Sequence, residues 1–293
     1  MLFLRSSMKI ISAIALLILS FFAITPAADA RSWHEVSDRK TLGISGMAAL
    51  NGSGTEFLVV HDNKNAGEPR LGKVTLIDGN INYETLPWPE DNLPVDLEAI
   101  TAVPGRDREF VALTSSGRGY HIAVNSAIVE LGTFSLPPVH AHANIEGFTL
   151  YDLDGTLTAI WGHRGAGLEP GVFNWGTIDL DTYTVQFQGS HTWYVPVPQG
   201  NVRHISDIKI DGAGVVFVSA ASDEGDDGPF DSAVYAAGSL RIEEGMPALF
   251  VNAEPVPLLR HRDRKIEAIE LMSAIGVILG SDDENRGASI FYP

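Results

Sequence analysis

One short pattern of apolar and polar positions recurs five times along the chain. Each copy has Ser or Glu between apolar positions, a small residue or Asp after it, and a turn rich in Gly, Asn, Asp or Ser a few residues later. Copies spaced about 50 to 60 residues apart indicate a repeat architecture. The copies are Gly43-Ile44-Ser45-Gly46-Met47, Asp96-Leu97-Glu98-Ala99-Ile100, Asn144-Ile145-Glu146-Gly147-Phe148, His204-Ile205-Ser206-Asp207-Ile208 and Lys265-Ile266-Glu267-Ala268-Ile269.

Further β-branched or apolar runs follow each copy and are typical of strands. The second runs cover 57–60, 110–113, 157–161, 215–219 and 277–279, and the third runs cover 73–77, 120–124, 172–178, 233–236 and 288–292. Four repeats continue into a fourth strand, such as 127–136 or 184–194. The fifth repeat lacks one, and residues 32–36 at the other end of the chain can supply it.

Four antiparallel strands per repeat are typical of a propeller blade. The sequence therefore predicts an all-β, five-bladed β-propeller closed by an N-terminal strand, with each repeated phrase as the innermost strand of its blade. An irregular β-sandwich is the structural alternative, but it does not explain the repeated phrase.

The first thirty residues have the pattern of an export signal. Arg5 and Lys9 accompany an apolar run over 10–24, and Ala28-Asp29-Ala30 resembles a cleavage site. The expected domains are a signal peptide at 1–30 and one propeller at 31–293, and the expected location is periplasmic or secreted. A membrane anchor is the alternative, although the run is shorter than the roughly 20 residues that span a bilayer.

The composition limits the kinds of site and binding partner that the chain can have. The chain has no cysteine, which excludes disulfides and thiolate sites, and its 37 acidic and 20 basic residues give a formal net charge of -17. Nucleic-acid binding depends on clustered Lys and Arg, so no nucleic acid is expected. We expect a monomer without membrane contact after signal cleavage.

The repeated phrase places the same position of every blade near the propeller axis. That column contains Ser45, Glu98, Glu146, Ser206 and Glu267. Converging carboxylates raise one another's pKa unless a cation lies among them, and an all-oxygen set suits Ca²⁺. The sequence predicts these five residues as ligands of one axial calcium ion. The alternative is a ring of hydrated acids, or acids paired with Lys265 and Arg203.

This ordered column resembles the axial calcium site of the calcium-activated nucleotidases (apyrases), five-bladed propellers that hydrolyse nucleoside di- and triphosphates. Over the whole chain, Asp96-Leu97-Glu98-Ala99-Ile100 and the segment Gly280-Ser281-Asp282-Asp283-Glu284-Asn285 are more similar to exported bacterial propellers called phytase-like or esterase-like. The chain lacks the long loops with which the nucleotidases enclose a nucleotide.

One face of the predicted propeller carries most of the charged loops, which is typical of a functional face. The leading expectation is a calcium-dependent hydrolase of phosphate esters or anhydrides acting on a small anionic, phosphorylated substrate. Asp62 and Asp282 are expected to hold or deprotonate the water, and Arg164 is the third candidate catalytic residue. Arg118, Arg203 and Arg286 are the candidates for binding phosphoryl oxygens.

Two alternatives stay open at this point. Five-bladed propellers also include glycosidases, in which Glu98 and Glu146 would form an acid and base pair. In the second alternative, the chain is a non-catalytic, calcium-stabilised propeller that binds a ligand or carbohydrate. Motifs of serine hydrolases, zinc peptidases and P-loop proteins are absent from the sequence. The large aromatic residues Trp161, Trp175, Trp193 and Phe173 are expected to pack between blades.

Overall fold

A computed structural model describes residues 32–89, 93–137, 142–272 and 276–292. The chain divides into two units, Met1–Ser32 and Trp33–Pro293. The predicted signal peptide lies outside the described residues. No helix within the described ranges is long and apolar enough to cross a membrane.

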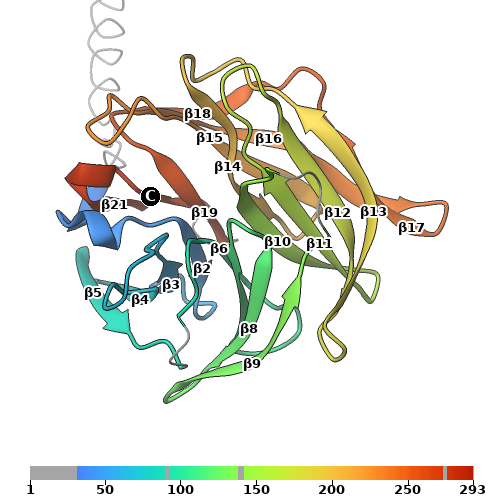
Figure 1. The fold of residues 1–293 in the computed structure, drawn as a ribbon, viewed down its shortest axis with the longest axis horizontal. Helices are drawn as coiled ribbons and strands as arrows, with labels where there is room; N and C mark the ends of the chain where they lie inside the picture. Colours follow the sequence, from blue (N-terminus) through green and yellow to red (C-terminus); the bar gives the residue numbers. More distant parts are fainter. Residues whose placement is uncertain (1–31, 90–92, 138–141, 273–275, 293) are drawn as a thin grey trace, which may run out of the picture. The chain divides into compact units, whose positions relative to one another are not determined.

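Trp33–Pro293 forms a five-bladed β-propeller, as predicted (Figure 1). Blade 1 contains β2 (Gly46–Ala49), β3 (Glu56–Val60), β4 (Leu71–Ile77) and β5 (Asn80–Leu86), and blade 2 contains β6 (Leu97–Ala102), β7 (Glu109–Thr114), β8 (Arg118–Val124) and β9 (Ile128–Ser135). Blade 3 contains β10 (Ile145–Leu153), β11 (Thr156–His163), β12 (Gly171–Asp179) and β13 (Thr184–Trp193). Blade 4 contains β14 (Val202–Ile210), β15 (Val215–Ser222), β16 (Asp231–Glu243), β17 (Met246–Val251) and β18 (Pro257–Arg262). Blade 5 contains β19 (Ile266–Met272), β20 (Gly276–Ser281), β21 (Ala288–Tyr292) and β1 (Ser32–Ser37); the 3₁₀ helices are η1 (Lys40–Leu42) and η2 (Glu284–Arg286).

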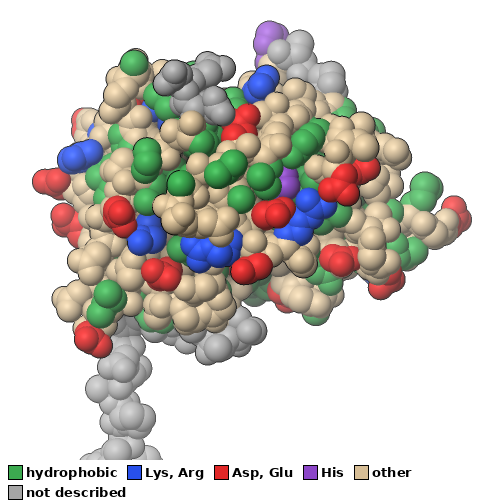
Figure 2. Space-filling view, turned by 90° about the horizontal axis from the view of Figure 1, so that it is seen from below, with side chains coloured by type: hydrophobic (Ala, Val, Ile, Leu, Met, Phe, Trp, Pro, Cys, Tyr) green, Lys and Arg blue, Asp and Glu red, His purple; other side chains and the backbone are tan. Residues whose placement is uncertain are grey.

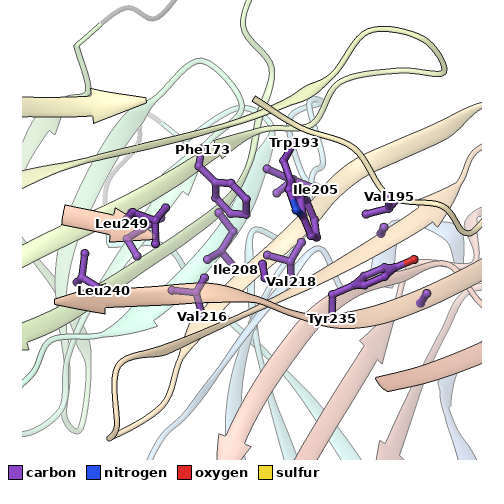
Figure 3. Packing of buried hydrophobic residues seen from close by; sticks show 14 of the residues in the cluster. Phe173, Trp193, Val195, Ile205, Ile208, Val216, Val218, Tyr235, Leu240 and Leu249 are labelled. Carbon is purple, nitrogen blue, oxygen red and sulfur yellow. The ribbon is translucent and has the colours of Figure 1, made fainter. Parts of the chain in front are cut away.

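The five innermost strands, β2, β6, β10, β14 and β19, contact one another in cyclic order. They are apolar and buried along most of their length because a neighbouring blade covers each face. Five separate apolar clusters fill the spaces between consecutive blades. The cluster between blades 3 and 4 includes Phe173, Trp193, Ile208 and Val218 (Figure 3). The expectation that Trp161, Trp193 and Phe173 pack in the core is confirmed.

The N-terminal strand closes the ring as predicted. The order of the fifth sheet is β1-β21-β20-β19, so residues from both ends of the propeller lie side by side. Trp33 on β1 also donates a hydrogen bond from Nε1 to Nδ1 of His261, at 3.2 Å. This bond ties blade 5 to the outer edge of blade 4.

Blade 4 differs from the prediction at its outer edge. The blade has a strand beyond the four expected: β18, which contains Arg260 and Arg262, pairs with the first part of β16, and β17 pairs with the last part. The 13-residue β16 is long enough to carry both partners in succession. The basic side chains of β18 therefore lie on an outer strand, away from the axis.

Two buried charged residues, Asp207 and Lys209, lie on the innermost strand of blade 4, β14. Nζ of buried Lys209 donates to the carbonyl oxygens of Met47, at 2.8 Å, and Ile100, at 2.6 Å. Buried Asp207 accepts the backbone N–H of Ile269 at 2.7 Å. Lys209 and Asp207 thus connect blade 4 to blades 1, 2 and 5, because a buried charge needs such partners.

Candidate functional site: an axial cluster of carboxyl groups

The three acids of the repeated phrase occupy irregular positions in their strands. The β-register shifts between Leu97 and Ala99, between Ile145 and Gly147, and between Ile266 and Ala268. Each shift leaves one residue outside the regular pairing, and these residues are Glu98, Glu146 and Glu267. A β-bulge redirects a side chain and is common beside active sites. The bulges explain how an acidic residue can lie in an otherwise apolar inner strand.

All five residues of the predicted column are buried. Exposed fractions are 1% for Ser45, 8% for Glu98, 2% for Glu146, 1% for Ser206 and 4% for Glu267. Buried charges need partners, so the surroundings of the three acids determine their chemistry.

Three protein cations contact these acids. Nη1 of Arg203 is 3.1 Å from Oε1 of Glu146 and 2.7 Å from Oε1 of Glu267. Nζ of Lys265, a buried side chain, is 3.2 Å from the same oxygen of Glu267. Arg164 also contacts Glu146, with Nη1 at 3.0 Å from Oε1. Glu146 and Glu267 are therefore paired with Arg and Lys, which is one of the arrangements that the sequence left open.

Glu98 differs from the other two acids because no ion pair accompanies it in the described part of the chain. Burial, followed by the nearby charge of Glu146, raises the pKa of Glu98 well above its usual range. Both causes favour the protonated form of Glu98, which is the form that can donate a proton. Burial also raises the pKa of Glu267 to about 7, although Lys265 and Arg203 oppose this shift.

Asp62 and Asp282, the two predicted water-activating residues, border the same cluster. Burial raises the pKa of both carboxyl groups, and the charge of Asp62 further raises the pKa of Asp282. Asp282 lies directly over Gly43, where an added Cβ would be 2.2 Å from Oδ1 of Asp282. Glycine at position 43 therefore provides the space that this carboxyl group occupies.

Several residues at the edge of the cluster were not predicted. Asp223 accepts hydrogen bonds from Arg203, Asp96 pairs with Lys64 at 2.9 Å, and Glu284 pairs with Lys265. A signal for Asp223 was present: it follows the second strand of its blade, as Asp62 and Asp282 do.

The three candidate phosphate-binding arginines do not converge, and only Arg203 lies beside Arg164. Arg203 and Arg164 are paired with carboxylates of the cluster. Arg118 lies over the ring of Tyr120, and Arg286 lies over the ring of Phe230 and donates to a backbone carbonyl. On the face seen in Figure 2, Lys and Arg side chains also alternate with Asp and Glu. The described residues thus do not gather these arginines into an anion-binding site.

The predicted calcium ligands fit the structure only in part. Within the described ranges, no group of three or more His, Asp or Glu side chains is placed to hold a metal ion, and Arg203 neutralises two of the expected ligands. In favour of a cation, the hydroxyls of Ser45 and Ser206 and Oε2 of Glu146 are buried and have no hydrogen-bond partner among the described residues. The axial calcium ion therefore stays a prediction.

Comparison with known proteins supports the fold. No protein-family model and no curated protein sequence matches the chain. Among solved structures, an exo-1,5-alpha-L-arabinanase from a bovine ruminal metagenomic library has a TM-score of 0.51 and 12% identity, over 85% of this chain and 91% of that chain. The GH43 endo-arabinanase of Bacillus licheniformis has a TM-score of 0.48 and 13% identity, over 87% and 95%. Sqt1 of Saccharomyces cerevisiae has a TM-score of 0.36 and 10% identity over 84% of this chain, which spans 58% of the length of that protein.

The similarity to the exo-1,5-alpha-L-arabinanase supports a β-propeller and is not specific to phytase-like or apyrase-like propellers. The predicted hydrolysis of phosphate esters or anhydrides is wrong, because this solved structure is a carbohydrate-active propeller. The physical reason lies in the cluster: its acids outnumber its bases, and its arginines are already paired, so a phosphorylated anion would be repelled.

Proposed function

We propose that the chain hydrolyses glycosidic bonds, with Glu98 as the general acid and Glu146 as the carboxylate that activates water or attacks the sugar. The observation that carries this proposal is the contrast between the two side chains. Glu98 is buried without an ion pair among the described residues, which favours its protonated form, whereas Glu146 is paired with Arg164 and Arg203. Glycosidases need one acid and one base beside the same bond.

The charge of the cluster supports a neutral substrate. The acids at its edge include Asp62 and Asp282 besides those in ion pairs, and a neutral carbohydrate brings no negative charge into this field. Sugar hydroxyls can donate hydrogen bonds to carboxylates and accept them from guanidinium groups. The similarity to an exo-1,5-alpha-L-arabinanase makes arabinan the first substrate to test.

The reaction would proceed in the usual order for paired carboxyl groups. Glu98 would transfer its proton to the glycosidic oxygen as the bond to the leaving sugar breaks. In the same step Glu146 would either take a proton from the water that attacks the anomeric carbon or itself form a bond to that carbon. In the second case, Glu98 would then take a proton from the water that breaks the bond between the sugar and Glu146. Arg164 and Arg203 would act as positioning residues, because each holds the Oε1 atom of Glu146.

The test is sugar release by the purified protein from arabinan, xylan and a panel of aryl glycosides. We expect Glu98→Gln and Glu146→Gln to lower kcat/KM by about 10²- to 10⁴-fold. Glu98→Gln should lose less activity on aryl glycosides with good leaving groups, because these need no proton. The matched control is Glu84→Gln, an exposed acid paired with Lys73. Absence of hydrolysis on every substrate, or equal activity of Glu98→Gln and wild type, would refute the proposal.

A further inference from the structure

The loop between β11 and β12 presents an apolar residue on a rigid support. Leu168 at its tip is 95% exposed. The N–H of Gly167 donates to the carbonyl of Val202 at 2.9 Å, and Ala166 and Glu169 pair with each other across the turn. Nδ1 of His204 accepts the N–H of Val195, so its Nε2–H donates to the carbonyl of Gly167 at 3.0 Å. The loop is therefore held in one position while its apolar tip faces solvent.

An aromatic side chain lies beside this tip. The hydroxyl of Tyr194 donates to the carbonyl of Leu168 at 3.3 Å, and its ring meets His204 edge-on, with centroids 5.2 Å apart. Trp193 and Val195 on either side of Tyr194 belong to the core between blades 3 and 4 (Figure 3). Tyr194 is 53% exposed, so it faces outward from a firmly packed segment.

Both segments that support this surface also carry the partners of Glu146. The loop of Leu168 begins at Arg164, and His204 follows Arg203 directly in β14. Nη1 of each arginine is about 3 Å from Oε1 of Glu146, at 3.0 Å for Arg164 and 3.1 Å for Arg203. The apolar surface is thus built on the same two segments as the charged site.

We propose that Tyr194 and Leu168 form a binding subsite for one sugar ring of an oligosaccharide whose neighbouring unit lies at the axial cluster. This inference rests on the proposed glycosidase function. The C–H face of a sugar ring packs on a flat aromatic surface, and the tyrosine hydroxyl and backbone carbonyls of the loop provide polar partners at its edge. Arg164 lies between Glu146 and Leu168 in the sequence. Its side chain is 30% exposed and can reach sugar hydroxyls.

The test separates binding from hydrolysis. Affinity electrophoresis in gels containing arabinan, xylan, mannan or β-glucan measures binding by wild type, Glu98→Gln, Tyr194→Ala and Leu168→Ser. We expect at least one polysaccharide to retard wild type and Glu98→Gln, and Tyr194→Ala to weaken that binding about tenfold. The control is Ile77→Ser. Ile77 is an apolar residue on blade 1 that is 54% exposed, close to the 53% of Tyr194, and this variant should bind like wild type. Thermal melting checks that each variant is folded.

The outcomes distinguish the two proposals. Binding that is lost in Tyr194→Ala, without hydrolysis by wild type, would support the subsite and refute the glycosidase. Hydrolysis by wild type with unchanged binding and KM in Tyr194→Ala would refute the subsite alone. If no polysaccharide retards the wild-type protein, the subsite is refuted. For an active protein, Tyr194→Ala should raise KM for a five-unit oligosaccharide, whereas KM for an aryl glycoside with a single sugar ring should stay the same.

Discussion

The guanidinium group of Arg203 lies 2.7 Å from the carboxylate of buried Glu267, and the Arg203 side chain is itself 14% exposed. The same nitrogen also pairs with Glu146, so one arginine serves two buried acids. Arg203→Met should therefore remove one of the two cations beside each of these acids and reduce the free energy of unfolding by about 1.5 to 3 kcal/mol. Urea denaturation measures this change.

A control separates this effect from the general loss of an arginine. Arg118→Met removes a guanidinium that is exposed and lies over Tyr120, and should cost less than about 1 kcal/mol. Similar denaturation midpoints for the two variants would contradict a stabilising role for Arg203 in the cluster.

The predicted axial calcium ion has a direct thermal test. If calcium binds the folded protein, a concentration 100 times the Kd should stabilise it by about 2.7 kcal/mol, and a chelator should reverse the effect. Glu98→Gln should weaken the calcium response, whereas Glu84→Gln should retain it. A melting temperature that is the same in calcium, magnesium and chelator would rule out the axial ion.

Stability should decrease between pH 6 and pH 8. Burial raises the pKa of Asp207 to about 7 from an ordinary value of 3.8. A carboxyl group whose pKa is raised by folding stabilises the protein fully at low pH, and this contribution is lost as pH rises through the folded pKa. For a folded pKa near 7, the loss over this interval is about 1.4 kcal/mol. Glu267 acts in the same direction.

Denaturant unfolding at several pH values measures this dependence. Asp207→Asn should give a flatter curve between pH 6 and pH 8, while the exposed Asp154→Asn should follow wild type. Buried His61 has the opposite effect at lower pH: burial lowers its pKa to about 4, so its contribution is lost as pH falls from about 6.5 through 4. Equal slopes for Asp207→Asn and wild type would show that Asp207 does not titrate as expected.

Gly43→Ala tests the position of Asp282 without removing a charge. The new Cβ would be 2.2 Å from Oδ1 of Asp282, so the carboxyl group has to move. We expect a folded protein with at least a tenfold lower kcat/KM for glycosides. Gly52→Ala is the control, because an added Cβ there meets no atom within 4 Å. Wild-type activity in Gly43→Ala would show that Asp282 is not needed where it lies.

The propeller could be predicted from the sequence because each blade repeats the same local pattern. The phrase around Glu98 has counterparts around Glu146 and Glu267, and each of these acids lies at a bulge of an inner strand. The closing role of residues 32–36 followed from the missing strand of the fifth repeat. These inferences need only the order of strands along the chain.

The chemistry of the site could not be predicted in the same way. Whether Arg203 binds a phosphate or pairs with Glu146 depends on distances across the axis, which connect different repeats. The sequence did contain one unused signal: Asp207 occupies a phrase position where the other repeats have Gly46, Ala99, Gly147 and Ala268. A charge in a position reserved for small residues indicates a buried polar contact, here with Ile269.

The pairing of β1 with β21 makes blade 5 the blade that closes the ring. Trp33 and His261, which meet beside this blade, are 228 positions apart in the sequence, so contacts of this kind form late and slowly during folding. Until β1 docks, β21 presents an unpaired edge to which another chain can add a strand. A synthetic peptide of residues 32–37 should therefore fill that edge in a variant that lacks its own β1. The propeller would then assemble from two separate molecules.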